Sequence, residues 1–302
     1  FIVIRALVIG RRRPGHQIGA AVRETSRLLE LGGWEVESAV VGHKRSLRHR
    51  AADAAKAGLD VVVAVGGDGA VFQVVNAVAG SPVVVGIVPK GTGNLLATNL
   101  DIPRSLAKAV EVLLTGEPRV IDLGRVSIGG ADHDFAVACG VGFDAVVMDS
   151  TDATTKRRWG TLAYVASALR ESRKIREADY EITIDGVTTE TPAAEVFIAN
   201  FGRVGAIVEP RRRIIPDDGL LDVIVARASG PLGGLRAGWE ALVQRQLGQA
   251  GDGRVFRTRA REVKVKAHPR QLVEVDGSVI GRTPIHVSIR PNGLTVIAPR
   301  RS

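Results

Sequence analysis

The 302-residue sequence has one cysteine, one methionine and few aromatic residues, which make up 4% of the chain. With Cys139 alone, no disulfide can form within the chain and no cysteine-based metal site can be built, which is typical of a reducing compartment. The longest apolar runs, such as residues 61–65 and 83–88, fall far short of the ~18–20 residues that cross a bilayer. The start of the chain does not have the pattern of a signal peptide. We therefore expect a cytoplasmic protein.

Several well-known site motifs are also missing. The sequence contains no G-x-x-x-x-G-K-[ST], which excludes a P-loop NTPase, and no G-x-G-x-x-G, which argues against an ordinary dinucleotide-binding domain. It contains no H-E-x-x-H, no G-x-S-x-G and no protein-kinase signature set. The six histidines do not have the spacing of metal ligands, so we interpret them as structural.

The chain is basic, with 41 Lys and Arg against 32 Asp and Glu and a formal net charge of +9. This balance favours anionic partners such as nucleotides, nucleic acid or acidic lipid headgroups, without choosing among them. The basic clusters are short, so we interpret most of them as solvated surface.

The first 120 residues alternate short β-branched runs with helical segments, which predicts a mostly parallel sheet with ligands at the carboxyl ends of its strands. From about residue 121, shorter alternating runs separated by Gly, Asp and Pro predict a second, β-rich domain. The strands expected in the first part are 2–8, 61–65 and 83–88, and the helices are 18–31, 71–78 and 104–114. In the second part the expected strands are 134–138, 180–184, 195–199, 221–226, 262–265, 272–275 and 285–289, and the helices are 159–169 and 235–247.

Two glycine-rich turns each follow an apolar strand and precede a helical segment. The first is Gly66-Gly67-Asp68-Gly69-Ala70, and the second is Pro89-Lys90-Gly91-Thr92-Gly93-Asn94. Glycine lets the backbone approach an anion, and a helix start offers unpaired N–H groups. Two such turns at one sheet edge suit a polyphosphate. For the first turn alone, a tight connection in which Asp68 only caps the helix remains an alternative.

These two turns open a longer series of motifs. It continues with Gly140-Val141-Gly142-Phe143-Asp144, Pro216-Asp217-Asp218-Gly219-Leu220 and Val275-Asp276-Gly277. In this order the motifs resemble the diacylglycerol kinase and sphingosine kinase family, in particular its bacterial members. The resemblance implies an N-terminal α/β domain similar to NAD kinase and phosphofructokinase, a β-rich sandwich-like C-terminal domain, and a ligand cleft between them. The first domain would comprise residues 1–121 with a returning strand at about 294–302, and the second residues 122–293.

The resemblance also implies a site for ATP and Mg²⁺. Asp276 would be the base that accepts the proton of the acceptor hydroxyl, and Asp68 is the other candidate catalytic carboxylate. For Asp276, a plain hairpin turn is the alternative, because Asp-Gly is a favoured turn pair. The residues implied to hold the nucleotide are Gly66, Gly67, Asp68, Gly69, Ala70, Thr92 and Asn94, and those implied to hold Mg²⁺ are Asp218 with the carbonyls of Ile215 and Leu220.

Three functions stay open at this stage. The first is an ATP-dependent lipid kinase that converts diacylglycerol to phosphatidic acid at the inner face of the membrane. The second is an attenuated nucleotide- or lipid-binding sensor, because Gly10, Ala70 and Ser278 depart from the family pattern. The third is a kinase of a soluble substrate, of the NAD kinase type. We expect no nucleic-acid partner, and a homodimer is left open. Trp159, beside Lys156, Arg157 and Arg158, is a candidate for membrane contact.

Overall fold

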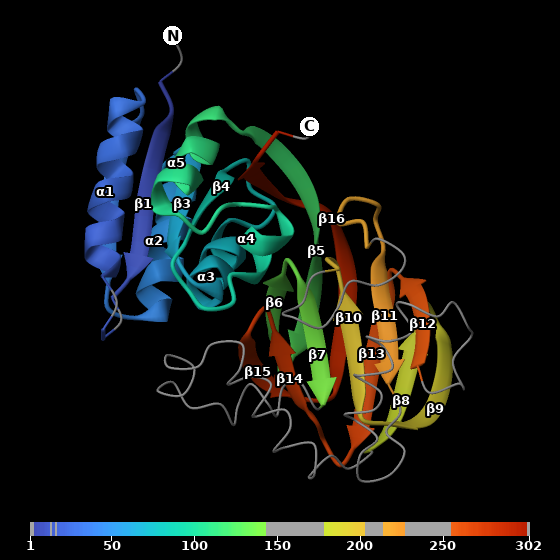
Figure 1. The fold of residues 1–302 in the computed structure, drawn as a ribbon. Coiled ribbons are helices and arrows are strands. Elements are labelled where there is room, and N and C mark those ends of the chain that lie inside the picture. Colours follow the sequence, from blue (N-terminus) through green and yellow to red (C-terminus); the bar gives the residue numbers. More distant parts are fainter. Residues whose placement is uncertain are drawn as a thin grey trace. The chain divides into compact units, whose positions relative to one another are not determined.

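The computed structural model describes residues 3–12, 14–15, 17–142, 178–202, 214–226 and 255–300. The chain divides into two compact units, residues 1–122 with 292–302 and residues 123–291. Helices are confined to the first unit in the described parts of the chain (Figure 1). None of these helices is long and apolar enough to cross a membrane.

The first unit is a parallel sheet between two layers of helices (Figure 1). Its strand order is β2-β1-β3-β4 followed by the last part of β16, and every neighbouring pair is parallel. Helix α1 packs with α5, and α2 packs with α3. The strands are β1 (Arg5–Arg11), β2 (Glu35–Val41), β3 (Val61–Gly66), β4 (Val84–Pro89) and β16 (Ile285–Ala298). The helices are α1 (Ile18–Leu31), α2 (Lys44–Lys56), α3 (Asp68–Val78), α4 (Leu95–Asn99) and α5 (Leu106–Thr115).

The apolar sequence of β3 explains its central place in this sheet. All six of its residues are buried, as expected for a parallel strand with helices on both faces. In contrast, β2 lies at the edge, and none of its residues is fully buried. Helix α2 buries only Leu47, Ala51 and Ala54. The weak apolar pattern of these two elements explains why the sequence did not predict them.

The second unit consists of antiparallel strands in two sheets. One sheet has the order β12-β11-β10-β7-β14-β15, and the other contains β16-β13-β8-β9 together with β5 and β6. The Tyr180 hydroxyl in β8 donates to the Val141 carbonyl in β7 at 3.3 Å, so the two sheets meet face to face. The remaining strands are β5 (Glu117–Ile128), β6 (Ala131–Phe135), β7 (Ala138–Gly142), β8 (Ala178–Ile184), β9 (Val187–Ala193), β10 (Glu195–Ala199), β11 (Leu221–Ala226), β12 (Val255–Ala260), β13 (Glu262–His268), β14 (Leu272–Val275) and β15 (Ser278–Arg282).

This architecture confirms the predicted fold class, although several bounds differ. The single strand predicted at 134–138 is wrong: β6 ends at Phe135 and β7 begins at Ala138. The strand predicted at 285–289 continues through Pro291 to Ala298 as one strand, β16. Strands β5, β9, β12 and β15 were not predicted either. The predicted helices 159–169 and 235–247, the Trp159 cluster, and residues 143–144 lie outside the described residues.

Candidate functional site

The two glycine-rich loops leave neighbouring strands of the first unit. Strands β3 and β4 are parallel and pair Gly66 with Pro89, so the loops begin side by side. The Lys90 N–H donates to the Gly66 carbonyl at 2.8 Å. A Cβ atom on Gly67 would lie only 2.8 Å from the Gly91 Cα atom. Glycine is therefore required at this contact because any side chain would push the loops apart.

The Asp68 carboxylate ties the second loop to helix α3, which follows the first loop. Asp68 is the first residue of α3, and its two oxygens accept the N–H groups of Asn94, at 2.9 Å, and Leu95, at 2.5 Å. Burial raises the pKa of this carboxyl, whereas the hydrogen bonds from Leu95 and Asn94 oppose that rise. The Asp68 side chain thus acts as a bracket between the two loops.

Asn94 and Arg104 fix the path of the second loop. Asn94 is buried in the left-handed region with φ 54°, and its side chain clasps Gly91: Oδ1 accepts the Gly91 N–H at 2.9 Å, and Nδ2 donates to the Gly91 carbonyl at 2.8 Å. The Arg104 guanidinium donates to the carbonyls of Thr92, at 3.0 Å, and Gly93, at 3.1 Å. With their carbonyls held in this way, Thr92 and Gly93 remain at the exposed tip of the loop.

Four backbone donors of these loops are left over. Within the described parts of the chain, no hydrogen-bond partner accepts the N–H groups of Gly67, Gly69, Thr92 or Gly93. Gly67 and Gly69 lie at the N-terminus of the 11-residue helix α3, where the helix dipole favours negative charge. The two fixed loops therefore present N–H groups in an arrangement that suits phosphate oxygens.

The structure brings the predicted loop residues together, but it gives their side chains different tasks. The Asp68 and Asn94 side chains hold the loops, and the Ala70 N–H donates to the Gly67 carbonyl at 2.8 Å. Direct contact of these three residues with a nucleotide stays a prediction. Sequence reasoning missed Arg104, whose guanidinium holds two carbonyls of the second loop.

Asp276 occupies the turn between β14 and β15. Its φ of 44° and that of 81° at Gly277 correspond to the hairpin turn that was the simpler interpretation of this pair. The carboxylate is also buried, and it accepts the N–H groups of Ala136 at 2.7 Å, Val137 at 2.9 Å and Ala138 at 3.0 Å. Asp276 thus fastens the hairpin to the segment between β6 and β7. Its role as a base stays a prediction.

The Asp218 loop, predicted to hold Mg²⁺, contains an ion pair. One Asp218 oxygen accepts the Leu220 N–H at 3.1 Å, and the other pairs with the Arg259 guanidinium. Ile215, whose carbonyl was a predicted ligand, is 43% exposed. Among the described residues, no three His, Cys, Asp or Glu side chains converge as a metal site. Arg259 thus lies beside the carboxylate that was expected to face the cation, and the binding of Mg²⁺ by Asp218 and these carbonyls stays a prediction.

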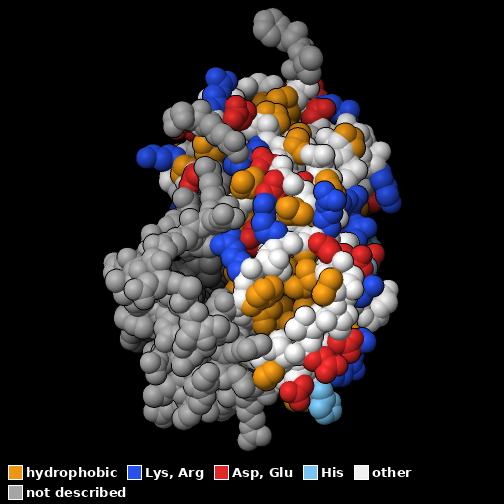
Figure 2. Space-filling model, turned by 90° about the vertical axis from the view of Figure 1, so that its right-hand side faces the viewer, with side chains coloured by type: hydrophobic (Ala, Val, Ile, Leu, Met, Phe, Trp, Pro, Cys, Tyr) orange, Lys and Arg blue, Asp and Glu red, His pale blue; other side chains and the backbone are white. Residues whose placement is uncertain are grey.

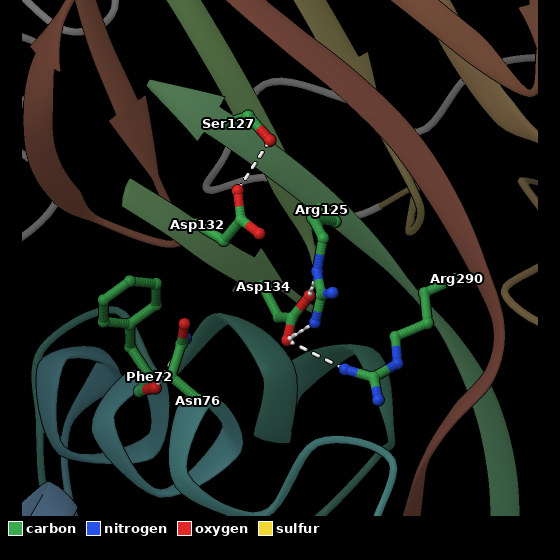
Figure 3. A network of polar contacts seen from close by, with 7 residues as sticks. All are labelled: Phe72, Asn76, Arg125, Ser127, Asp132, Asp134 and Arg290. Carbon is green, nitrogen blue, oxygen red and sulfur yellow. Dashed lines mark hydrogen bonds and ion pairs between the residues drawn. The ribbon is translucent and has the colours of Figure 1, made fainter. Parts of the chain in front are cut away.

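A second polar cluster lies within the second unit (Figure 3). Arg125 in β5 makes two bonds to Asp134 in β6, at 2.8 and 2.9 Å, and Arg290 in β16 makes one at 3.2 Å. Asp134 is 6% exposed, so its charge is balanced at a buried position by two guanidinium groups. The cluster joins three strands, and no sequence motif indicated it.

Comparison with known proteins agrees with this architecture. Residues 5–126 match the diacylglycerol kinase catalytic domain, and residues 137–298 match the YegS C-terminal NAD kinase beta sandwich-like domain. A diacylglycerol kinase from Mycobacterium tuberculosis H37Rv is 30% identical over 298 residues, which cover 95% of this chain and 92% of the relative. The chain belongs to the diacylglycerol kinase family. The resemblance inferred from the motifs is thereby confirmed.

Two further matches have lower coverage or lower identity. An uncharacterized protein of Synechocystis is 29% identical over 79% of this chain, but the match spans only 54% of the length of that relative. A crystal structure of a diacylglycerol kinase from Bacillus anthracis Sterne superposes with a TM-score of 0.74, covering 98% of this chain and 96% of the other at 18% identity. At that identity the second match supports the fold alone.

Proposed function

We propose that this family member is an ATP-dependent lipid kinase that phosphorylates the hydroxyl of diacylglycerol and yields phosphatidic acid. The observation that carries the proposal is the pair of bracketed loops with unpaired N–H groups at Gly67, Gly69, Thr92 and Gly93. The names of the relatives support a lipid as the acceptor. ATP is the donor that the kinase family implies.

The loops suit this reaction because phosphoryl transfer depends mainly on positioning and on charge stabilisation. The N–H groups would hold the phosphate oxygens, and the N-terminus of α3 would stabilise their negative charge. The acceptor oxygen would bond to the γ-phosphorus while the bond to the bridging oxygen breaks and ADP leaves. We assign the proton of the acceptor hydroxyl to Asp276. Mg²⁺, when bound with ATP, would supply further neutralisation of the phosphates.

A diacylglycerol acceptor lies in a bilayer, so the proposed enzyme would work at a membrane surface. The net charge of +9 favours an anionic surface, at about 1 kcal/mol for each Lys or Arg that lies close to it. Figure 2 shows Lys and Arg side chains spread among acidic ones over the described part of one face. We propose peripheral binding at the inner face of the membrane, driven by many dispersed charges.

The test is transfer of label from γ-³²P-ATP to vesicles of phosphatidylcholine with 10% diacylglycerol. We expect label in phosphatidic acid, and none in vesicles that lack diacylglycerol. Binding of ADP is measured on the same preparation by calorimetry. Nucleotide binding without lipid labelling would refute the kinase proposal, and labelling of NAD in the absence of vesicles would instead favour a soluble substrate.

A second function is favoured by one observation in the second unit. The Asp276 carboxylate is engaged by three backbone N–H groups, and Ser278 follows where the family motif places a glutamate. A protein with this arrangement could bind nucleotide or lipid as a sensor, without turnover. ADP binding together with lipid binding and no transfer, in the same assay, would support the sensor.

A further inference from the structure

Basic residues gather at the carboxyl edge of the first-unit sheet. Strand β1 ends at Arg11, and the next residue, Arg12, donates its N–H to the Val41 carbonyl at the end of β2, at 2.8 Å. Three residues after Val41, Lys44 begins helix α2. Strand β1 also pairs with β3, so these strand ends lie along the same edge as the Gly66–Ala70 loop.

Lys44 reaches that loop. A Cβ atom placed on Gly69 would lie 3.8 Å from the Lys44 Cε atom and 3.9 Å from its Nζ atom. The ammonium group is therefore beside the first turn of α3, next to a residue whose N–H is one of the four left over. The Lys44 side chain is exposed, so its charge is accessible to a ligand from solvent.

A phosphate group at this place would be attracted by two features of the protein. The N-terminus of α3 favours an anion. The Lys44 ammonium, beside the same turn, would attract the same phosphate at the Gly67–Gly69 N–H groups. The position of Lys44 thus suits a loop that carries an anion during function.

We propose that Lys44 binds the polyphosphate chain of the nucleotide, together with the N–H groups of Gly67 and Gly69. The inference rests on the proposed function and adds to it a cation from helix α2, outside the two glycine-rich turns, of which the second contains Lys90. Because the ammonium contacts phosphate and neither base nor ribose, it should act on ATP, ADP and inorganic triphosphate alike and leave adenosine unaffected.

The test compares Lys44→Ala with Lys56→Ala. Lys56 is also exposed and lies in the last turn of the same helix, about 18 Å away at 1.5 Å per residue. Both variants lose one charge from α2, but only the first loses a charge beside the loop. Calorimetry with ADP, inorganic triphosphate and adenosine should show that Lys44→Ala weakens the two phosphate ligands at least about tenfold, the scale of one charged hydrogen bond. Lys56→Ala should match the wild type within about twofold.

A second measurement uses the wild-type protein. Mild acetylation with and without inorganic triphosphate, followed by mass spectrometry, should show protection of Lys44 and no protection of Lys56. Equal affinities of the two variants for ADP and triphosphate, or equal acetylation of Lys44 in both conditions, would overturn the role of Lys44 and leave the kinase proposal standing. A wild-type protein that binds neither ADP nor triphosphate would overturn both, whereas tight ADP binding without lipid labelling would overturn only the kinase.

Discussion

The substitution Asp276→Asn separates the structural role of this carboxylate from its proposed catalytic role. Asparagine keeps the size of the side chain and tolerates the left-handed backbone, so the hairpin turn at φ 44° should persist. However, an amide offers one acceptor oxygen in place of two. The Nδ2 group would then face a backbone N–H of the segment from Ala136 to Ala138, donor against donor.

The cost can be worked from these bonds. A hydrogen bond to a charged group contributes about 1.5–3 kcal/mol, and a buried N–H left without an acceptor costs about 1–3 kcal/mol. We therefore expect Asp276→Asn to lower the free energy of unfolding by about 3–5 kcal/mol. For a unit of this size, 1 kcal/mol shifts the melting temperature by about 2–4 °C, so the melting temperature should fall by about 6–20 °C.

The matched control is Asp185→Asn in the turn between β8 and β9. Asp185 also precedes a glycine, has φ 46° and accepts two backbone N–H groups, from Arg261 at 3.0 Å and Glu262 at 2.8 Å, but it is exposed. We expect it to cost less than about 1 kcal/mol. Equal melting temperatures of the two variants would refute the role of the Asp276 carboxylate in holding the segment from Ala136 to Ala138.

Activity is then measured at a temperature where the Asp276→Asn variant is fully folded. If Asp276 is also the base, lipid phosphorylation should fall by about 100-fold or more while ADP affinity stays unchanged. A purely structural Asp276 would leave the rate of lipid phosphorylation intact under these conditions.

Three further outcomes are expected. Asp68→Ala should release the second loop and weaken ADP binding by about tenfold or more, since two N–H bonds are lost; unchanged affinity measured by calorimetry would return Asp68 to helix capping. Burial raises the pKa of the Cys139 thiol, so DTNB should react with it at pH 8 only when the protein unfolds, and the labelling rate should rise with denaturant concentration. Rapid labelling without denaturant would contradict this burial. Arg125→Ala should cost about 1–2 kcal/mol in urea unfolding and Arg290→Ala less, because Arg125 makes two of the three bonds to Asp134; the opposite order would contradict the geometry.

The elements predicted well are those whose own residues carry a strong apolar pattern. Helix α1 and strands β10, β11 and β14 have the bounds that the sequence predicted. The break between β6 and β7 could not be predicted in this way, because it is held by the carboxylate of Asp276, about 140 residues away along the chain.

In the candidate site, too, the features set by neighbouring residues could be predicted, and those set by distant residues could not. The glycine turns could be recognised from their residues, since close backbone approach needs glycine at Gly67 and Gly91. The bracket from Asp68 to Asn94 spans 26 residues and depends on how β3 and β4 pair. Lys44 was missed for a related reason: its place beside Gly69 follows from the packing of α2 against α3.

The most direct test of the phosphate site is an NMR titration of protein labelled with ¹⁵N-glycine. Of the 35 glycines, the amide signals of Gly67, Gly69 and Gly93 should shift most when ADP is added, because their N–H groups are the donors left over in the loops. Adenosine should leave these three signals in place. Saturating ADP that moves other glycine signals but not these would contradict the assignment of the two loops as the phosphate site.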